Sequence, residues 1–170
     1  MAIEQITDSN YIDFKKYPRS VLLVTISWCQ PCKDYEPIIN TLSNQIPYIK
    51  FGKTIIDKDK SIQLKKEYHD LNSWKFPTTL LFKNQKEISR IQGVAPYSNV
   101  LSKIKDALIL ESKVFVPGSN GKYIPAIINY IQDNNDIYRI KLMEDSSLGE
   151  KNNIIEIKKE KFLWSLELNL

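Results

Sequence analysis

The stretch Trp28-Cys29-Gln30-Pro31-Cys32-Lys33 holds the only two cysteines of the 170-residue chain. Just before it, residues 21–26 form an apolar, β-branched run that is typical of a buried strand. After it, apolar residues recur at helical spacing, at Tyr35, Ile38, Ile39 and Leu42. The pattern therefore predicts that Cys29 lies in the first turn of a helix that directly follows a central strand.

A cysteine at the start of a helix has a specific reactivity. The unpaired N–H groups and the positive end of the helix dipole stabilise a thiolate there, and the thiolate is the reactive form of cysteine. Cys32 lies one turn further along, where it can close a disulfide with Cys29. Two cysteines are too few for a structural disulfide framework, so the pair indicates catalysis in a reducing compartment.

Composition and charge narrow the class of protein. With 42% hydrophobic and 26% charged residues, the chain has the composition of an ordinary soluble protein. Residues 1–17 lack a signal-peptide core and no later run is long enough to cross a membrane, which predicts a cytoplasmic protein with no membrane partner. Residues 1–112 carry 16 basic and 12 acidic residues, and residues 113–170 carry 8 of each. Nucleic-acid binders concentrate basic residues in one stripe or domain, so we expect no nucleic-acid partner.

Helices and strands alternate over the first two thirds of the chain. We expect a first helix capped by Asp8 or Ser9, and later helices over residues 29–45, 61–68 and 98–110. Pro37 lies inside the second helix and should kink it. The expected strands cover residues 21–26, 48–57, 79–82 and 87–91. This α-β-α-β-α-β-β-α order predicts an α/β domain.

Several motifs recur in the order and spacing of thioredoxins. They are Trp28-Cys29-x-Pro31-Cys32-Lys33, Pro37, Lys53-x-x-x-Asp57, Phe76-Pro77-Thr78, Leu81-Phe82-Lys83-Asn84 and Gly93. Residues 1 to about 110 therefore resemble the thioredoxin family, and we expect a first domain over residues 1–112. The resemblance implies a thioredoxin-like fold, with a central mixed sheet flanked by helices, and an enzyme that exchanges a redox-active Cys29–Cys32 pair with protein disulfides. A reductase or a small thiol would supply the electrons, with no cofactor and no metal.

The resemblance also implies which residues meet a substrate. It makes Pro77 a cis proline facing the disulfide, which leaves the Phe76 backbone to pair with an extended substrate segment; the alternative is a trans proline that starts an edge strand. Trp74 either borders the groove or packs in the core, and the single histidine, His69, is expected to be a surface residue. The substrate-binding residues implied are Trp28, Gln30, Pro31, Trp74, Phe76, Pro77 and Gly93.

Two positions depart from the family pattern. Thioredoxins usually carry a buried aspartate six residues before the first cysteine, where this chain has Leu23. Lys53, which matches the family's lysine at this site and is a candidate for electrostatic tuning, is then expected to lose its counter-charge. Gln30 replaces the usual glycine between the cysteines and adds an amide where a partner docks, so recycling by a flavin-dependent reductase is in question.

The last 58 residues change character. Five short apolar segments, at residues 114–117, 123–131, 137–143, 154–158 and 162–164, are separated by turn-forming residues, which predicts a small antiparallel barrel. The opening hairpin reads Gly121-Lys122-Tyr123-x-Pro125-Ala126-x-Ile128, followed by Tyr138-Arg139-Ile140-Lys141-Leu142. It resembles those of Tudor-like and SH3-like modules, so we expect a second domain over residues 113–170. Such modules bind peptides, or bind methylated cationic side chains in an aromatic cage. The candidate cage aromatics, which alternatively fill the barrel core, are Phe115, Tyr123, Tyr130, Tyr138 and Trp164.

Two functions remain open from the sequence alone. The first is a thiol–disulfide oxidoreductase whose barrel selects the partner. The second is a redox-inactive binding adaptor that uses the thioredoxin-like part as a scaffold, which the departures at Leu23 and Gln30 favour. The retained cysteine pair, with no thiol elsewhere, favours the enzyme.

Overall fold

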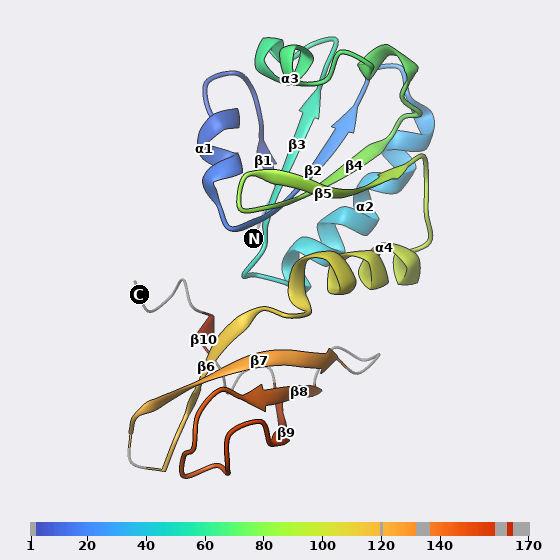
Figure 1. The fold of residues 1–170 in the computed structure, drawn as a ribbon. Helices are drawn as coiled ribbons and strands as arrows, with labels where there is room; N and C mark the ends of the chain where they lie inside the picture. The colour runs from blue at the N-terminus through green and yellow to red at the C-terminus, as the bar shows by residue number, and fades with distance from the viewer. Residues whose placement is uncertain (1–2, 120, 132–136, 159–162, 165–170) are drawn as a thin grey trace. The chain divides into compact units, whose positions relative to one another are not determined.

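The computed structural model describes residues 3–119, 121–131, 137–158 and 163–164. The chain forms two compact units that divide between Leu108 and Ile109. The boundary expected from the sequence, between residues 112 and 113, stays a prediction. Each unit has a sheet of its own (Figure 1).

The first unit is built on a mixed sheet. Its strands are β1 (Glu4–Gln5), β2 (Arg19–Thr25), β3 (Lys50–Ile55), β4 (Thr78–Lys83) and β5 (Lys86–Gln92), in the spatial order β1-β3-β2-β4-β5. Strands β1, β3 and β2 run parallel, and β4 is antiparallel to β2 and β5. This is the thioredoxin-like arrangement that was predicted, with one additional strand, β1. The sequence did not predict β1, because a strand of two residues has no hydrophobic periodicity to detect.

The expected helices all form, with shifted ends. They are α1 (Tyr11–Lys16), α2 (Gln30–Gln45), α3 (Ile62–Glu67) and α4 (Tyr97–Ile104), together with the 3-10 turn η1 (Leu71–Ser73) and the π-helical turn η2 (Lys105–Ile109). The N-cap of α1 is Asn10, so the expected capping by Asp8 or Ser9 is wrong. The Asp8 carboxylate instead accepts from the backbone N–H of Gln63 in the first turn of α3, at 2.9 Å.

Helices cover both faces of this sheet. Alternate residues of β2 and β4, namely Leu22, Val24, Leu80 and Phe82, share one apolar core with residues of α1 and α3. The intervening position Thr79 faces α2, where its hydroxyl donates to the Tyr35 hydroxyl at 3.4 Å. Every residue of β2 is buried, as expected of a central strand covered on both sides. The chain therefore leaves β2 for the cysteine turn from a fixed position.

The second unit is a five-stranded antiparallel sheet. Its strands are β6 (Lys113–Pro117), β7 (Tyr123–Ile131), β8 (Ile137–Leu142), β9 (Ile154–Lys158) and β10 (Leu163–Trp164), in the order β10-β6-β7-β8-β9. Burial alternates along β8, so one face is apolar and packed. This arrangement is consistent with the small barrel-like module that was predicted. Phe162, expected in the last strand, lies outside the described residues.

The described residues include no helix with the length and apolar character required to span a bilayer.

Candidate redox site

The two cysteines form a disulfide at the start of α2. Cys29 is the N-cap residue and the Sγ atoms of Cys29 and Cys32 are 2.08 Å apart. The backbone N–H of Cys32 donates to Cys29 Sγ at 3.1 Å, which is the interaction that would stabilise a thiolate on Cys29 after reduction. Pro31 occupies the first turn, where its missing N–H costs no helical hydrogen bond. The predicted position of Cys29 is confirmed.

The surroundings of the disulfide are unevenly exposed. Trp28 is 73% exposed, whereas Cys29 retains 8% and Cys32 3% of their accessible surface. Cys29 is therefore the cysteine that an incoming disulfide can reach. Gln30 is exposed, but its amide donates to the Asp34 carboxylate at 2.9 Å, one helical turn along α2. The added amide is thus held along α2.

Pro77 and Gly93 lie together at the edge of the site. Because β2 and β4 are antiparallel, with Val24 opposite Thr78, the start of β4 lies beside the end of β2 from which the cysteine turn departs. The Phe76–Pro77 peptide is cis, as predicted. The Gly93 N–H donates to the Pro77 carbonyl at 2.7 Å, and Gly93 has a φ of 83°, which favours glycine. No hydrogen bond is found for the Phe76 backbone among the described residues.

An aspartate anchors the turn before the cysteines. The Asp57 carboxylate accepts from the Ser27 backbone N–H at 2.8 Å and from the Ser27 hydroxyl. The hydroxyl bond lowers the pKa of Asp57 below its ordinary value, and the backbone bond from Ser27 acts in the same direction. Asp57 therefore stays ionised and ties the end of β3 to the residue that precedes Trp28.

Lys53 has a counter-charge after all. Leu23 is fully buried and faces Lys53 in the register of β2 and β3, so no carboxylate lies at the family's usual position. The Lys53 ammonium instead pairs with the Glu36 carboxylate at 2.6 Å. The expectation that Lys53 lacks a partner is therefore wrong. Sequence reasoning missed Glu36, because its position four residues after Cys32 places these two side chains on one face of a helix but does not indicate that Lys53 of β3 lies beside it.

Trp74 does not border the site. It is 5% exposed and packs edge-on against Tyr68, with 5.0 Å between the ring centroids. The guanidinium of Arg90 lies 4.7 Å from the centre of its ring, and Glu87 binds that guanidinium. Of the two alternatives weighed for Trp74, core packing is correct, because burial of the large indole outweighs exposure at the rim.

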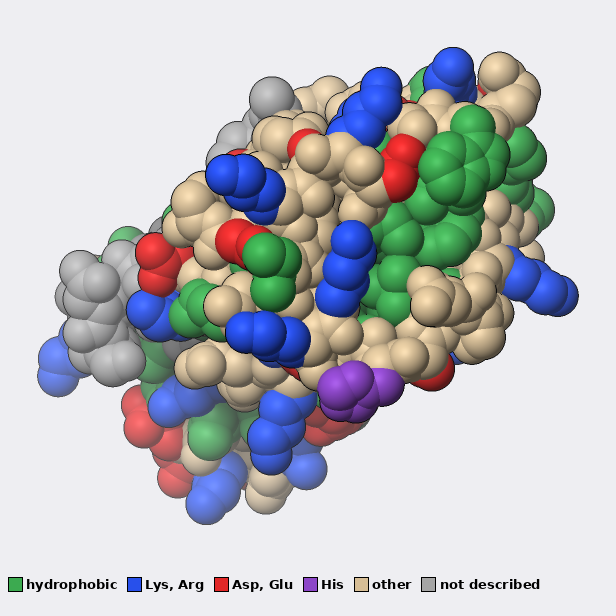
Figure 2. Space-filling model, turned by 90° about the horizontal axis from the view of Figure 1, so that it is seen from above, with side chains coloured by type: hydrophobic (Ala, Val, Ile, Leu, Met, Phe, Trp, Pro, Cys, Tyr) green, Lys and Arg blue, Asp and Glu red, His purple; other side chains and the backbone are tan. Residues whose placement is uncertain are grey.

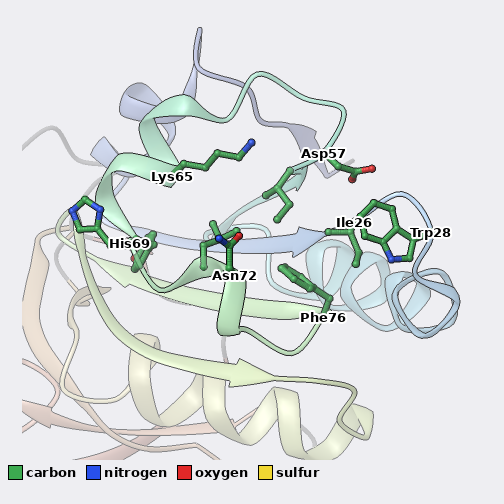
Figure 3. Close-up of a pocket in the computed structure, with 10 residues that line it drawn as sticks. Ile26, Trp28, Asp57, Lys65, His69, Asn72 and Phe76 are labelled. Carbon is green, nitrogen blue, oxygen red and sulfur yellow. The ribbon is translucent and has the colours of Figure 1, made fainter.

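A pocket of ≈ 470 Å³ opens beside Trp28 and Phe76. Figure 2 shows a contiguous apolar area on the upper face of the molecule, bordered by basic and acidic side chains. In Figure 3, Trp28 and Asp57 lie at one end of the pocket and His69 at the opposite end, with Lys65, Asn72 and Phe76 between them. His69 is exposed, as expected, but its position on the pocket could not be inferred from the sequence.

Comparison with known proteins identifies the first unit. A family model described as Thioredoxin matches residues 3–106. The chain belongs to the thioredoxin family. Thioredoxin-1 of Saccharomyces cerevisiae is 37% identical over 70 residues, which are 41% of this chain and 63% of that protein. Putative thioredoxin-4 of Dictyostelium discoideum is 37% identical over 81 residues, which are 48% of this chain and 71% of that protein.

Solved thioredoxin structures agree in fold. The oxidized form of mitochondrial thioredoxin 3 from Saccharomyces cerevisiae superposes with a TM-score of 0.51 at 27% identity, covering 61% of this chain and 94% of that one. Thioredoxin f2 of Chlamydomonas reinhardtii gives a TM-score of 0.54 at 20% identity, covering 63% and 97%. The chain spans less than two thirds of the first curated relatives, 63% of the yeast protein and 61% of thioredoxin from Chlamydia pneumoniae.

The aromatic residues of the second unit do not share one environment. Tyr138 is fully buried and Phe115 is 8% exposed, whereas Tyr123 and Tyr130 are 48% and 46% exposed. Arg139 lies over the Tyr130 ring at 5.3 Å and also pairs with Glu156. An aromatic cage needs ring faces that are open to a ligand. The burial of Tyr138 and Phe115 therefore argues against a role for these two residues in such a cage. The side chain of Trp164 lies outside what the structure describes.

Proposed function

We propose that the protein is a thiol–disulfide oxidoreductase that exchanges its Cys29–Cys32 pair with disulfides of protein substrates. The observation that carries the proposal is the disulfide at the N-cap of α2, with Cys29 Sγ accepting a backbone N–H. Membership of the thioredoxin family supports it. The alternative of a redox-inactive adaptor has no comparable observation in its favour, because the cysteine pair stands at the start of α2 despite the departures at Leu23 and Gln30.

The reaction passes through a mixed disulfide. The Cys29 thiolate attacks one sulfur of the substrate disulfide, so a Cys29–substrate bond forms and the first substrate thiolate leaves. The Cys32 thiolate then attacks Cys29 Sγ and displaces the second substrate thiolate. Two electrons have passed to the substrate, and Cys29 and Cys32 are joined. A reductase or a small thiol returns the pair to the dithiol by the same two steps.

The substrate chain is held at the rim of the disulfide. The Phe76 backbone, which has no hydrogen-bond partner among the described residues, pairs with an extended segment by strand addition. Pro77 and the Gly93 loop bound that segment on one side, and Trp28, Gln30 and Pro31 on the other. Lys53, paired with Glu36 on α2, tunes the charge near the second cysteine.

Insulin-disulfide reduction with dithiothreitol tests the activity. We expect the wild-type chain to accelerate precipitation of the insulin B chain and Cys29→Ser to abolish the acceleration. Cys32→Ser is the matched control, because it loses turnover but accumulates a mixed disulfide through Cys29. A Cys29→Ser variant as active as the wild type would remove the proposal.

The reactivity of Cys29 separates the enzyme from the adaptor. The rate of iodoacetamide alkylation against pH should titrate with a midpoint below the value of a free thiol, about 8.5, since the α2 N-terminus stabilises the thiolate. A midpoint at the free-thiol value, with partner capture unaffected by replacing both cysteines, would favour the adaptor.

We further propose that the second unit selects partners through a peptide ligand, and that the protein acts in the cytoplasm. Exposed Tyr123 and Tyr130 support a binding role for the outer surface of the sheet. In a Cys32→Ser background, replacing both tyrosines with alanine should change the set of proteins trapped as mixed disulfides. The same double tyrosine variant with both cysteines intact should still reduce insulin. An unchanged set would remove the role in selection.

A further inference from the structure

The pocket beside the disulfide continues well beyond the residues that meet the attacked sulfur. Its floor is apolar and is formed by Ile26, Ile56, Leu71 and Phe76. Its volume, ≈ 470 Å³, is that of a site for several side chains or a small ligand. The wall opposite Trp28 comes from α3 and the segment after it, which contribute Lys65, His69 and Asn72.

Charge is distributed asymmetrically along this pocket. At the disulfide end, the Asp57 carboxylate is engaged by both hydrogen bonds from Ser27. At the other end, no ion pair or side-chain hydrogen bond is found for Lys65 or His69 among the described residues. Glu67, the acidic residue of α3, is bound by Lys15 and by the Tyr11 hydroxyl. The far end of the pocket thus offers an ammonium and an imidazole N–H to an anion.

We propose that this pocket reads an acidic residue of the substrate protein. This inference rests on the oxidoreductase function proposed above and names its preferred substrate. The segment next to the attacked cysteine lays an apolar side chain on Ile56, Leu71 and Phe76. A carboxylate a few residues further along binds Lys65 and His69, while the ionised Asp57 disfavours a carboxylate at the near end.

Pairs of peptide disulfides that differ only in a carboxylate or an amide at one position test the preference. The probes are homodimers of short peptides with one cysteine and one leucine, in which aspartate or asparagine stands two, three or four residues before or after the cysteine. The fully reduced, full-length protein is mixed with each peptide, and its oxidation is followed by acid quenching and chromatography. We expect the aspartate peptide to react roughly three- to fivefold faster than the asparagine peptide in one register, the size of a partly exposed ion pair.

Variants of α3 provide the matched comparison. Lys65→Gln should lower the aspartate-to-asparagine rate ratio toward one. Lys66→Gln removes the same charge from the neighbouring exposed position, which does not line the pocket, and should keep the wild-type ratio. Lys65→Glu should reverse the preference toward a lysine peptide of the same register. Raising the salt to 0.5 M should shrink the wild-type ratio, because ions screen such pairs.

The outcomes distinguish the two proposals. If the reduced protein is oxidised by the peptide disulfides, but at equal rates by the aspartate and asparagine peptides in every register, the acidic preference is overturned and the oxidoreductase function stands. An equal loss of the preference in Lys66→Gln would overturn its assignment to this pocket. Failure of the reduced protein to react with any peptide disulfide would remove the oxidoreductase function, and the inference with it.

Discussion

Ser27 and Asp57 show how single hydrogen bonds place the reactive turn. Two bonds to one carboxylate join the residue before Trp28 to the end of β3. Both residues are polar, and no hydrophobic pattern marks them. Their pairing nevertheless fixes the direction in which the chain leaves the sheet toward Cys29.

Replacing Ser27 should change the titration of Asp57. In Ser27→Ala the lowered pKa of Asp57 should rise toward the ordinary aspartate value, because the bond that lowers it most is lost. Because the pKa of Asp57 is lower in the folded than in the unfolded state, the bonds to Asp57 stabilise the folded protein at pH values above the unfolded-state pKa of about 4. This stabilisation is lost as the pH falls through the folded-state pKa. Wild type and variant should therefore differ in free energy of unfolding at neutral pH and converge in acid.

Carbon-13 carboxyl titration and urea unfolding at several pH values check this. Ser73→Ala is the control, because the Ser73 hydroxyl donates to the Asp70 carbonyl and does not touch Asp57. An Asp57 midpoint unchanged by Ser27→Ala would contradict the prediction.

The ion pair of Lys53 and Glu36 should contribute modestly to stability. Both side chains are partly exposed, at 20% and 33%, so screening limits the gain. In a double-mutant cycle with Lys53→Met and Glu36→Gln we expect a coupling free energy of about 0.5–1 kcal/mol. The pair of Lys16 and Asp13, 61% and 75% exposed, is the control and should give less coupling. Equal couplings in the two cycles would show that the burial of Lys53 has no effect.

Strand β3 depends on one glycine for its contact with β1 and α1. Gly52 lies opposite Glu4, and a Cβ atom placed on it would meet Ile6 Cγ1 at 2.6 Å and Phe14 Cε2 at 2.8 Å. Neither atom can withdraw freely, because Ile6 and Phe14 are themselves buried in the core. Ile6, directly after β1, and Phe14 of α1 thus pack closely against β3 only because Gly52 has no side chain.

Gly52→Ala should lower the free energy of unfolding by about 1–3 kcal/mol, the usual cost of overpacking a core. Urea unfolding followed by circular dichroism measures it. In the Ile6→Ala background the same substitution should cost less, since the closest atom is gone. Equal costs in both backgrounds would mean that the contact with Ile6 is not the cause.

At the scale of the whole molecule, the disulfide and the core beneath it belong to the first unit alone. Sheet β1 to β5 and helices α1 to α4 all precede Ile109, where the second unit begins. The residues that surround the disulfide, from Trp28 to Gly93, lie within the same unit. The second unit has a separate hydrogen-bonded sheet, so the two hydrophobic cores are expected to form separately.

A fragment of residues 1–112 should therefore fold and keep the redox activity. We expect one cooperative thermal transition by circular dichroism and an insulin-reduction rate within about twofold of the full chain, because the fragment has the size of a single small domain. The same fragment carrying Cys29→Ser is the control for activity. A fragment without a cooperative transition would show that the first unit requires the second.

The sequence by itself determined the local part of the site, because a β-branched run followed by helical spacing sufficed to place Cys29 at the start of a helix. The roles of Pro77 and Gly93 followed from the resemblance of their motifs to those of thioredoxins. The sequence also determined the two-part organisation, because hydrophobic periodicity is a local property of the chain. Only the tertiary structure decided that Glu36 pairs with Lys53, that Trp74 is buried and that His69 lines the pocket. These outcomes depend on which distant segments the fold brings together, and no local pattern encodes such contacts.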